Sequence, residues 1–352
     1  MKKDLHGMTL KEYYDLFQDL AEKKYRAKQL FQWVFQKAIT DFQKMTNLPQ
    51  ELTLKLQQEV DFSGLKIKKK LISRLDDTTK FLLSLPDGET IETVRMSYTG
   101  KESRDRHTVC VSTQVGCPIG CPFCATGLSG WVRNLTTGEI VGQVLEMQKD
   151  VQRNFPGKKV TNVVFMGMGE PLLNYDNVLK AINIINDPLG INIGMRRITI
   201  STSGLVPQIN ALAKEKLPIV LAISLHAANN NLRNELVPIN KKYPLDELLS
   251  ACRDYISSTG RRITFEYALI AGKNDQAKDA LELRNLLKGM QANVNLIPLN
   301  TVGETKLRRS QNKIVKIFAQ KLQESGLEVA IREEKGSDID AACGQLRRRR
   351  VE

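Results

Sequence analysis

The sequence predicts an α/β fold: a partial (βα)6 barrel, with an N-terminal helical accessory segment and a small antiparallel sheet in front of it. Three observations support this prediction. Strand-like and helix-like patterns alternate from about residue 108 onward, residues 1–62 show helical spacing of apolar side chains, and the stretch between them carries short strand-like runs.

The N-terminal segment, residues 1–62, reads as helices. Thr9 and Glu12 form a capping-box pattern at the start of the first one. The second helix carries an apolar face from Ala27 to Ala38, and Pro49 precedes a third, short helix. The aromatic stripe around Trp33 fits the core of an amphipathic helix better than a surface for stacking bases.

A connector of small strands is predicted over residues 63–97. The candidate strands are 71–75, 79–85 and 90–96. Asp87-Gly88, between the last two, is a hairpin signal. The connector therefore reads as a small antiparallel sheet that joins the helical segment to the barrel.

The barrel is predicted over residues 98–335. Its candidate strands are 108–112, 160–166, 197–202, 219–226, 264–270 and 293–298. Helical patterns between and after them include 137–151, 245–257, 276–288 and 312–325, and a further strand-like run follows at 329–332. Six repeats fill a partial barrel and fall short of the eight of a closed one.

The charge and hydropathy of the chain narrow the range of partners and locations to be expected. The net charge of +13 suits a polyanionic partner such as RNA, although it is also compatible with a merely soluble basic surface. The basic residues are bunched at 66–70, 196–197, 261–262, 306–309 and 347–350.

No apolar run approaches the roughly 18–20 residues of a membrane span, and no secretory signal is seen, so a cytoplasmic protein is expected. Residues 336–352 read as a loop and a basic tail outside the core.

Three cysteines carry the strongest chemical signal. Cys117, Cys121 and Cys124 form a C-x3-C-x2-C loop directly after the first barrel strand, at the end where α/β folds keep their active sites. A structural zinc site normally has four protein ligands, and no fourth cysteine or histidine lies nearby. Three thiolates suit a four-iron cluster that leaves one iron open for a substrate.

Polar residues follow the next barrel strands. Gly169 and Glu170 end the second strand, and Ser201 ends the third. His226, taken alone, is more typical of a structural histidine, but it stands beside the other strand ends. The grouping predicts a ligand pocket at one end of the barrel.

These features resemble a known family. The cysteine spacing is the mark of radical S-adenosylmethionine (SAM) enzymes, in which the open iron binds SAM. The sequence further resembles the RlmN family, adenine C2-methyltransferases of large-subunit (23S) ribosomal RNA and of transfer RNA. The matching stretches, which extend over nearly the whole chain, are 25–33, 91–94, 110–124, 133–135, 167–174, 201–204, 224–227, 295–300 and 338–346. Residues 338–346, Asp-Ile-Asp-Ala-Ala-Cys-Gly-Gln-Leu, discriminate best.

The resemblance implies a role for each site residue. Cys117, Cys121 and Cys124 would hold a [4Fe-4S] cluster. The residues that would contact SAM are Gly169, Glu170, Ser201, Ser224, Leu225, His226 and Asn300.

The remaining implied residues are catalytic. Cys343 would carry the methyl group to the base, Cys110 would release the methylated RNA through a transient disulfide, and Glu92 would take the C2 proton. Without the resemblance, Cys110 reads as a buried core thiol and Glu92 as a solvated carboxylate. Cys252 matches no motif and is assigned to helix packing.

Two alternatives stay open. A Cfr-like enzyme uses the same cysteines but methylates C8 of the ribosomal adenine, and residues 169–174 resemble the C2 enzymes more closely. A non-catalytic zinc-binding RNA protein is the alternative from another class. The expected partners are 23S rRNA, tRNA and an electron donor such as flavodoxin or ferredoxin, and a monomer is expected.

Overall fold

The computed structural model describes residues 2–100 and 103–348. Its centre is a ten-stranded sheet in the order β14-β13-β12-β11-β10-β9-β6-β5-β4-β3. Neighbouring strands from β6 to β14 pair in parallel, which confirms the predicted α/β architecture. These parallel strands are β6 (Ser103–Cys110), β9 (Asn162–Phe165), β10 (Ile198–Thr202), β11 (Val220–Ser224), β12 (Ile263–Leu269), β13 (Ala292–Pro298) and β14 (Glu328–Ile331).

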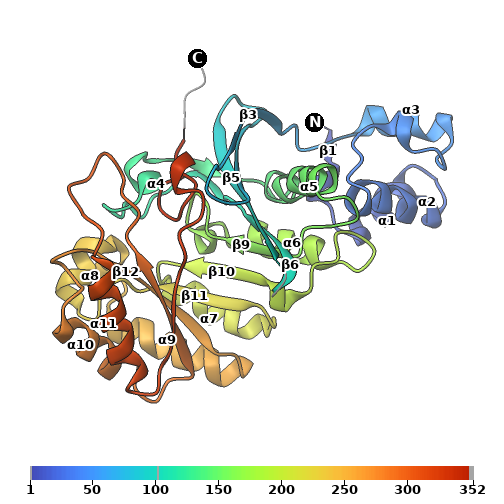
Figure 1. The fold of residues 1–352 in the computed structure, drawn as a ribbon. Helices are drawn as coiled ribbons and strands as arrows, with labels where there is room; N and C mark the ends of the chain where they lie inside the picture. The colour runs from blue at the N-terminus through green and yellow to red at the C-terminus, as the bar shows by residue number, and fades with distance from the viewer. Residues whose placement is uncertain (1, 101–102, 349–352) are drawn as a thin grey trace.

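Helices connect the parallel strands and cover the outside of the curved sheet (Figure 1). They are α5 (Thr137–Asn154), α6 (Tyr175–Asn186), α7 (Val206–Glu215), α8 (Asn230–Leu236), α9 (Leu245–Thr259), α10 (Ala277–Leu287) and α11 (Asn312–Gln323). Short turns of helix, η4 (Pro171–Asn174), η5 (Met195–Arg197) and η6 (Pro238–Lys241), lie in the connections. Cys252 of α9 is completely buried, so its assignment to packing is confirmed.

The antiparallel strands belong to the same sheet. β3 (Lys66–Ile72), β4 (Thr78–Ser84) and β5 (Thr90–Gly100) continue it beyond β6. The boundary predicted between residues 97 and 98 therefore falls inside β5, which is paired with β4 and β6, and it does not separate two units. The strand predicted at 71–75 was misplaced: β3 starts at Lys66, because an edge strand can carry a run of lysines in solvent.

The first barrel strand was also predicted too late. β6 begins at Ser103 and ends at Cys110, whereas the prediction ran from 108 to 112. The exposed, charged residues 105–106 hid its first half, which extends β6 as the hairpin partner of β5.

The N-terminal segment folds as predicted into helices, α1 (Leu10–Asp19), α2 (Lys24–Phe31) and α3 (Gln50–Glu59). The capping box of Thr9 and Glu12 is present. The apolar face of the second helix is buried, so the prediction of a core stripe is confirmed. The shorter elements are β1 (Lys3–Asp4), which pairs with β2 (Val60–Asp61), the turns η1 (Leu5–Gly7) and η3 (Phe42–Lys44), and the π-helix η2 (Gln32–Gln36), which continues α2.

A small hairpin encloses the cysteine loop. β7 (Gln114–Gly116) pairs with β8 (Trp131–Asn134), and the short helix α4 (Ala125–Leu128) lies between them. Gly116 has a φ of +78°, and a Cβ there would lie 1.9 Å from the carbonyl oxygen of Gly130. Only glycine at position 116 therefore lets β7 and β8 pair this closely at the base of the cysteine loop.

The C-terminal segment is a loop, as predicted, but part of it is buried. After β14 it runs up across the open face of the sheet to the turn η7 (Ser337–Ile339), and beyond it the carbonyl of Gly344 accepts a hydrogen bond from the N–H of Ala125 in α4 (Figure 1). Ala341, Ala342 and Leu346 are buried, so the prediction that this segment lies outside the core was wrong. Residues 349–352, part of the predicted basic tail, lie outside the described residues. Within the described residues, no helix is long and apolar enough to cross a membrane.

Candidate active site

A cavity of about 930 Å³ lies between the cysteine loop and the ends of the parallel strands. Most of the predicted metal-binding and cofactor-binding residues line it. They are Cys117, Cys121, Cys124, Gly169, Glu170, Ser201, Ser224, His226 and Asn300. Residues from loops far apart in sequence therefore meet at one end of the sheet, as expected for polar residues at parallel strand ends.

The three cysteine thiols of the loop face this cavity. Burial raises the pKa of the Cys117 thiol to about 12 and that of Cys121 well above its usual range. A metal centre would reverse this preference, because coordinated thiols are held as thiolates. In the described part of the chain, no three His, Cys, Asp or Glu side chains converge as on a single metal ion. The set of thiols around an open cavity fits a larger cluster with one position left for a ligand.

Glu170 is held in place by several donors. One carboxylate oxygen accepts hydrogen bonds from the backbone N–H and the hydroxyl of Ser203, at 2.7 and 2.8 Å, and the other accepts from the N–H of Leu172. Burial raises the pKa of the Glu170 carboxyl, while these hydrogen bonds oppose the rise. The result is a fixed acceptor at the cavity wall, suited to an ammonium group.

Gly169 lines the cavity and is also required by its backbone conformation. Its φ is +102°, and a Cβ there would lie 2.6 Å from the Cβ of Gln114. The glycine is therefore required by the packing of this turn against β7, in addition to its position on the cavity wall.

Glu266 is a site residue that the sequence analysis missed. It lies on β12, is buried, and accepts a hydrogen bond from Ser201 at 2.7 Å and a longer one from Ser224 at 3.5 Å. The three side chains form a polar cluster in the cavity wall. An acidic residue inside an otherwise apolar predicted strand was the available signal.

His226 is a neutral donor. Its Nδ1 accepts a hydrogen bond from the N–H of Ala268 at 3.0 Å, so the ring proton sits on Nε2. Burial lowers the pKa of His226 to about 3. Its neighbour Leu225, also predicted to contact SAM, is completely buried and does not line the cavity. The structure therefore brings His226 into the site but not the Leu225 side chain.

Arg233 is a second missed residue. It lies on α8, is completely buried, and donates hydrogen bonds to the carbonyl oxygens of Ser203, Ser224 and Leu225 and to the side chain of Asn240. Its guanidinium thus ties together the ends of two parallel strands behind the cavity. Its position on a polar-looking helix gave no sign of burial.

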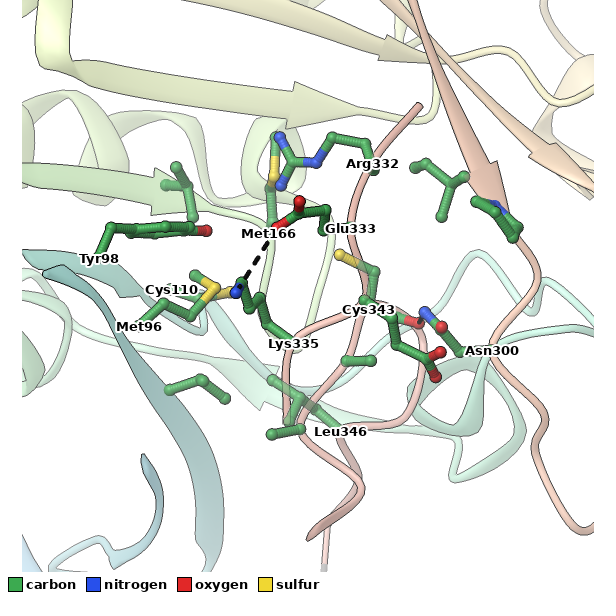
Figure 2. Close-up of a pocket in the computed structure, with 17 residues that line it drawn as sticks. Met96, Tyr98, Cys110, Met166, Asn300, Arg332, Glu333, Lys335, Cys343 and Leu346 are labelled. Atoms are coloured by element: carbon green, nitrogen blue, oxygen red, sulfur yellow. Dashed lines mark hydrogen bonds and ion pairs between the residues drawn. The ribbon is translucent and has the colours of Figure 1, made fainter. Parts of the chain in front are cut away.

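A second cavity, of about 700 Å³, adjoins the first. Cys110 and Cys343 both line it, together with Met96, Tyr98 and Arg332 (Figure 2). Four residues line both cavities: Met166, Ile297, Asn300 and Cys343. Cys343 therefore lies at the junction of the two spaces.

The two predicted catalytic thiols differ in their access to solvent. Cys110 is buried, and burial raises the pKa of its thiol. Cys343 is reached by solvent through the cavity mouth, yet the surrounding protein removes enough water to raise the pKa of its thiol too. Arg332 opposes both rises. All six cysteines are free in the structure.

Glu92 lies apart from both cavities. It is on β5, on the same face as Val94 and Met96 of the second cavity, but it is buried and forms an ion pair with Lys80 at 3.3 Å. Its carboxylate also accepts a hydrogen bond from the backbone N–H of Arg347 at 3.0 Å. In this structure, therefore, the C-terminal segment contacts the Glu92 carboxylate directly.

Family models match most of the chain. The radical SAM superfamily model matches residues 111–284, and the model of the ribosomal RNA large subunit methyltransferase N-terminal domain matches residues 3–61. The first match includes the cysteine loop and the strands around the first cavity. The second matches the helical segment and its closing strand pair.

Similar proteins cover the whole length. The chain is 51% identical to a probable dual-specificity RNA methyltransferase RlmN of Desulfitobacterium hafniense, over 99% of this chain and 97% of the relative. It is 50% identical to a protein of the same description from Alkaliphilus oremlandii, over 100% and 99%. The crystal structure of a radical SAM methyltransferase from Sphaerobacter thermophilus superposes with a TM-score of 0.94, at 43% identity over 98% of this chain and 99% of that one.

The cofactors follow from the superfamily. Radical SAM enzymes use a [4Fe-4S] cluster and SAM, and the donors around the first cavity fit both groups. The three thiols suit the cluster, and Glu170, the serines and His226 suit the polar groups of SAM. With relatives of about 50% identity over its full length, the chain belongs to the RlmN family of radical SAM RNA methyltransferases.

Proposed function

We propose that the protein methylates C2 of a specific adenosine in 23S rRNA and of the adenosine 3′ of the anticodon in certain tRNAs. The observation that carries this proposal is the junction of the two cavities at Cys343. One cavity holds the donors for cluster and SAM, and the other adjoins it and is lined by Cys110 as well as Cys343. A thiol between them can pass a methyl group from one to the other.

A ring carbon such as C2 of adenine is a poor nucleophile, so ordinary methyl transfer fails. When bound, the cluster and SAM supply the methyl group and the radical chemistry that this carbon requires. The chain's own residues hold and orient the reactants. Cys117, Cys121 and Cys124 anchor the cluster, and Cys343 carries the methyl group as a thioether to the base.

Release of the product needs a second thiol. Once the carbon of the Cys343 thioether is bonded to the base, the thiolate of Cys110 attacks the sulfur of Cys343. The carbon–sulfur bond breaks, and its electron pair stays with the carbon, which takes up a proton and becomes the methyl group. A Cys110–Cys343 disulfide remains, and a cellular thiol reductant reduces it back to two thiols. The two thiols line the same cavity, and cytosolic disulfides are usually transient and catalytic.

The proton from C2 is assigned to Glu92. Its carboxylate lies on the same face of the sheet as the second cavity, beyond Val94. One of its oxygens accepts the N–H of Arg347, so the C-terminal segment lies beside the assigned base.

RNA binding accounts for the charge. The net charge of +13 favours binding to phosphates, and a base in folded RNA must be unstacked to enter the second cavity. The N-terminal helices supply a further surface for RNA. A flavodoxin or ferredoxin would deliver the electrons, and the protein would act as a monomer in the cytoplasm.

The test is anaerobic reconstitution with iron and sulfide, followed by reaction with SAM, a reductant and an RNA fragment. We expect 2-methyladenosine on mass spectrometry of the nucleosides. Exclusive formation of 8-methyladenosine would assign the chain to the Cfr-like alternative. A colourless protein that binds zinc and releases no 5′-deoxyadenosine would favour the zinc-binding alternative.

A further inference from the structure

Lys80 is a buried lysine that the mechanism above does not use. Its side chain on β4 is 2% exposed, and a lysine is almost never buried to this degree unless it is paired. Its ammonium forms the ion pair with Glu92, whose side chain is equally buried, at 3.3 Å. The same ammonium donates a hydrogen bond to the backbone carbonyl of Asp340 at 2.8 Å.

The ion pair contacts both ends of one loop. Asp340, bound by Lys80, lies three residues before Cys343, and Arg347, whose N–H is bound by Glu92, lies four residues after it. Between these two points the loop is also held by Asn300 and by the hydroxyl of Thr126, which donates to the carbonyl of Leu346. Two oppositely charged groups on neighbouring strands thus hold the ends of the segment that carries the methyl-bearing thiol.

We propose that Lys80 is a positioning residue, and that the Lys80–Glu92 ion pair latches the loop of residues 340–347 so that Cys343 stays at the junction of the two cavities. The catalytic meaning of this latch rests on the proposed function, in which Cys343 carries the methyl group. The latch itself rests on the contacts of Lys80 and Glu92.

The latch also couples proton uptake to loop release. A carboxylate that gains a proton loses its charge, which weakens both its attraction to Lys80 and its hydrogen bond from the N–H of Arg347. If Glu92 takes the C2 proton, the loop around Cys343 loosens in the same step. This loosening lets the Cys343 sulfur turn toward Cys110 for release of the RNA.

The experiment is hydrogen–deuterium exchange of the cluster-loaded protein, followed by mass spectrometry of its peptides. Several amides of the loop are hydrogen-bonded, among them those of Ala341, Gln345 and Arg347. In Lys80→Met, we expect these amides to exchange about tenfold faster or more, because loss of the ammonium opens the loop locally. Peptides of β12 should keep their protection, and Lys80→Arg should restore most of it in the loop.

A matched control separates the latch from general destabilisation. Arg95→Met breaks another buried ion pair, the one between Arg95 and Asp150. The side chains of these two residues are 6% and 8% exposed. In this variant, the ratio of the amide exchange rate of residues 340–347 to that of β12 should stay as in the wild type. If Lys80→Met fails to fold, Lys80→Met/Glu92→Gln removes both charges and leaves no buried ion unpaired. Unchanged exchange of the loop in Lys80→Met, or in Lys80→Met/Glu92→Gln where the single variant does not fold, overturns the proposal, and so does an equal rise in Arg95→Met.

Turnover of the same variants distinguishes the latch from the proposed function. We expect Lys80→Met to lower kcat with little change in the KM for RNA, and Lys80→Arg to recover it. Faster loop exchange with full methylation activity would confirm the latch and remove the loop geometry from the proposed mechanism. Abolished activity with unchanged loop exchange would refute the latch and leave the proposed function intact.

Discussion

The side-chain amide of Asn300 donates a hydrogen bond to the backbone carbonyl of Cys343, at 3.0 Å. Asn300 follows β13, and its side chain lines both cavities. One residue at a strand end thus joins the barrel to the loop that carries Cys343 (Figure 2).

Asn300→Ala should slow methylation about fivefold, because the Cys343 carbonyl loses its donor, and one such hydrogen bond contributes about 1 kcal/mol. Asn300→Asp should be slower still, since a carboxylate oxygen would face the carbonyl oxygen. Single-turnover rates with preloaded SAM measure the effect. Asn295→Ala, on β13 itself, is the control, and equal rates in all variants would contradict this role of Asn300.

Cys110→Ala should trap a covalent protein–RNA adduct, because the thiol that attacks the Cys343 sulfur is missing. Denaturing gel electrophoresis with labelled RNA detects the adduct. Cys343→Ala should form none and should abolish methylation while the visible absorption of the cluster stays unchanged. Cys252→Ala, a buried thiol far from the site in sequence, controls for loss of any cysteine, and free methylated RNA from Cys110→Ala would rule out the assigned role.

His6→Gln should make stability less sensitive to acid. Burial lowers the pKa of His6 from its usual 6.5 to about 3. Between these values the unfolded chain binds a proton at His6 that the folded chain does not. The contribution of His6 to the free energy of unfolding is therefore fully present above pH 6.5 and is lost as the pH falls from 6.5 toward 3. At pH 5 this loss is about 2 kcal/mol. Urea unfolding at pH 7 and pH 5 should show a drop smaller by that amount in His6→Gln than in the wild type, and equal drops would refute the shift.

Replacing Lys66, Lys68 and Lys69 of β3 by alanine should raise the KM for RNA and leave kcat unchanged. These lysines are exposed and lie on β3, at the edge of the sheet. The log–log slope of RNA affinity against salt concentration should become shallower by about one for each phosphate that the variant no longer neutralises. Lys313→Ala/Lys316→Ala on α11 is the control, and an equal effect of both sets would show a non-specific charge response.

Much of the site could be predicted because its chemistry is local. The cysteine spacing lies within eight residues, and the polar residues at strand ends follow from the alternation of strands and helices. Glu266, Arg233 and Lys80 could not be identified in this way. Each is a charged residue whose burial depends on partners contributed by other elements, and a single sequence does not reveal such partners.

The C-terminal segment shows the same limit for the fold. Its small and polar residues have no helix or strand period, so they read as a solvated loop. Their burial comes from interactions with distant parts of the chain, such as Thr126 with Leu346, 220 residues apart. The edge strand β3 was misplaced for the opposite reason, since its lysines follow local rules for solvent exposure and conceal the strand pairing.

The continuous ladder from β14 to β3 has a practical consequence for dissecting this protein. A fragment that starts at residue 98 would strip β6 of its antiparallel neighbour and expose a bare row of amide and carbonyl groups, which invites aggregation. A fragment meant to contain the parallel strands must therefore begin before Lys66, where β3 starts. Strands β3, β4 and β5 cover the edge of β6, so they cannot be removed without exposing it.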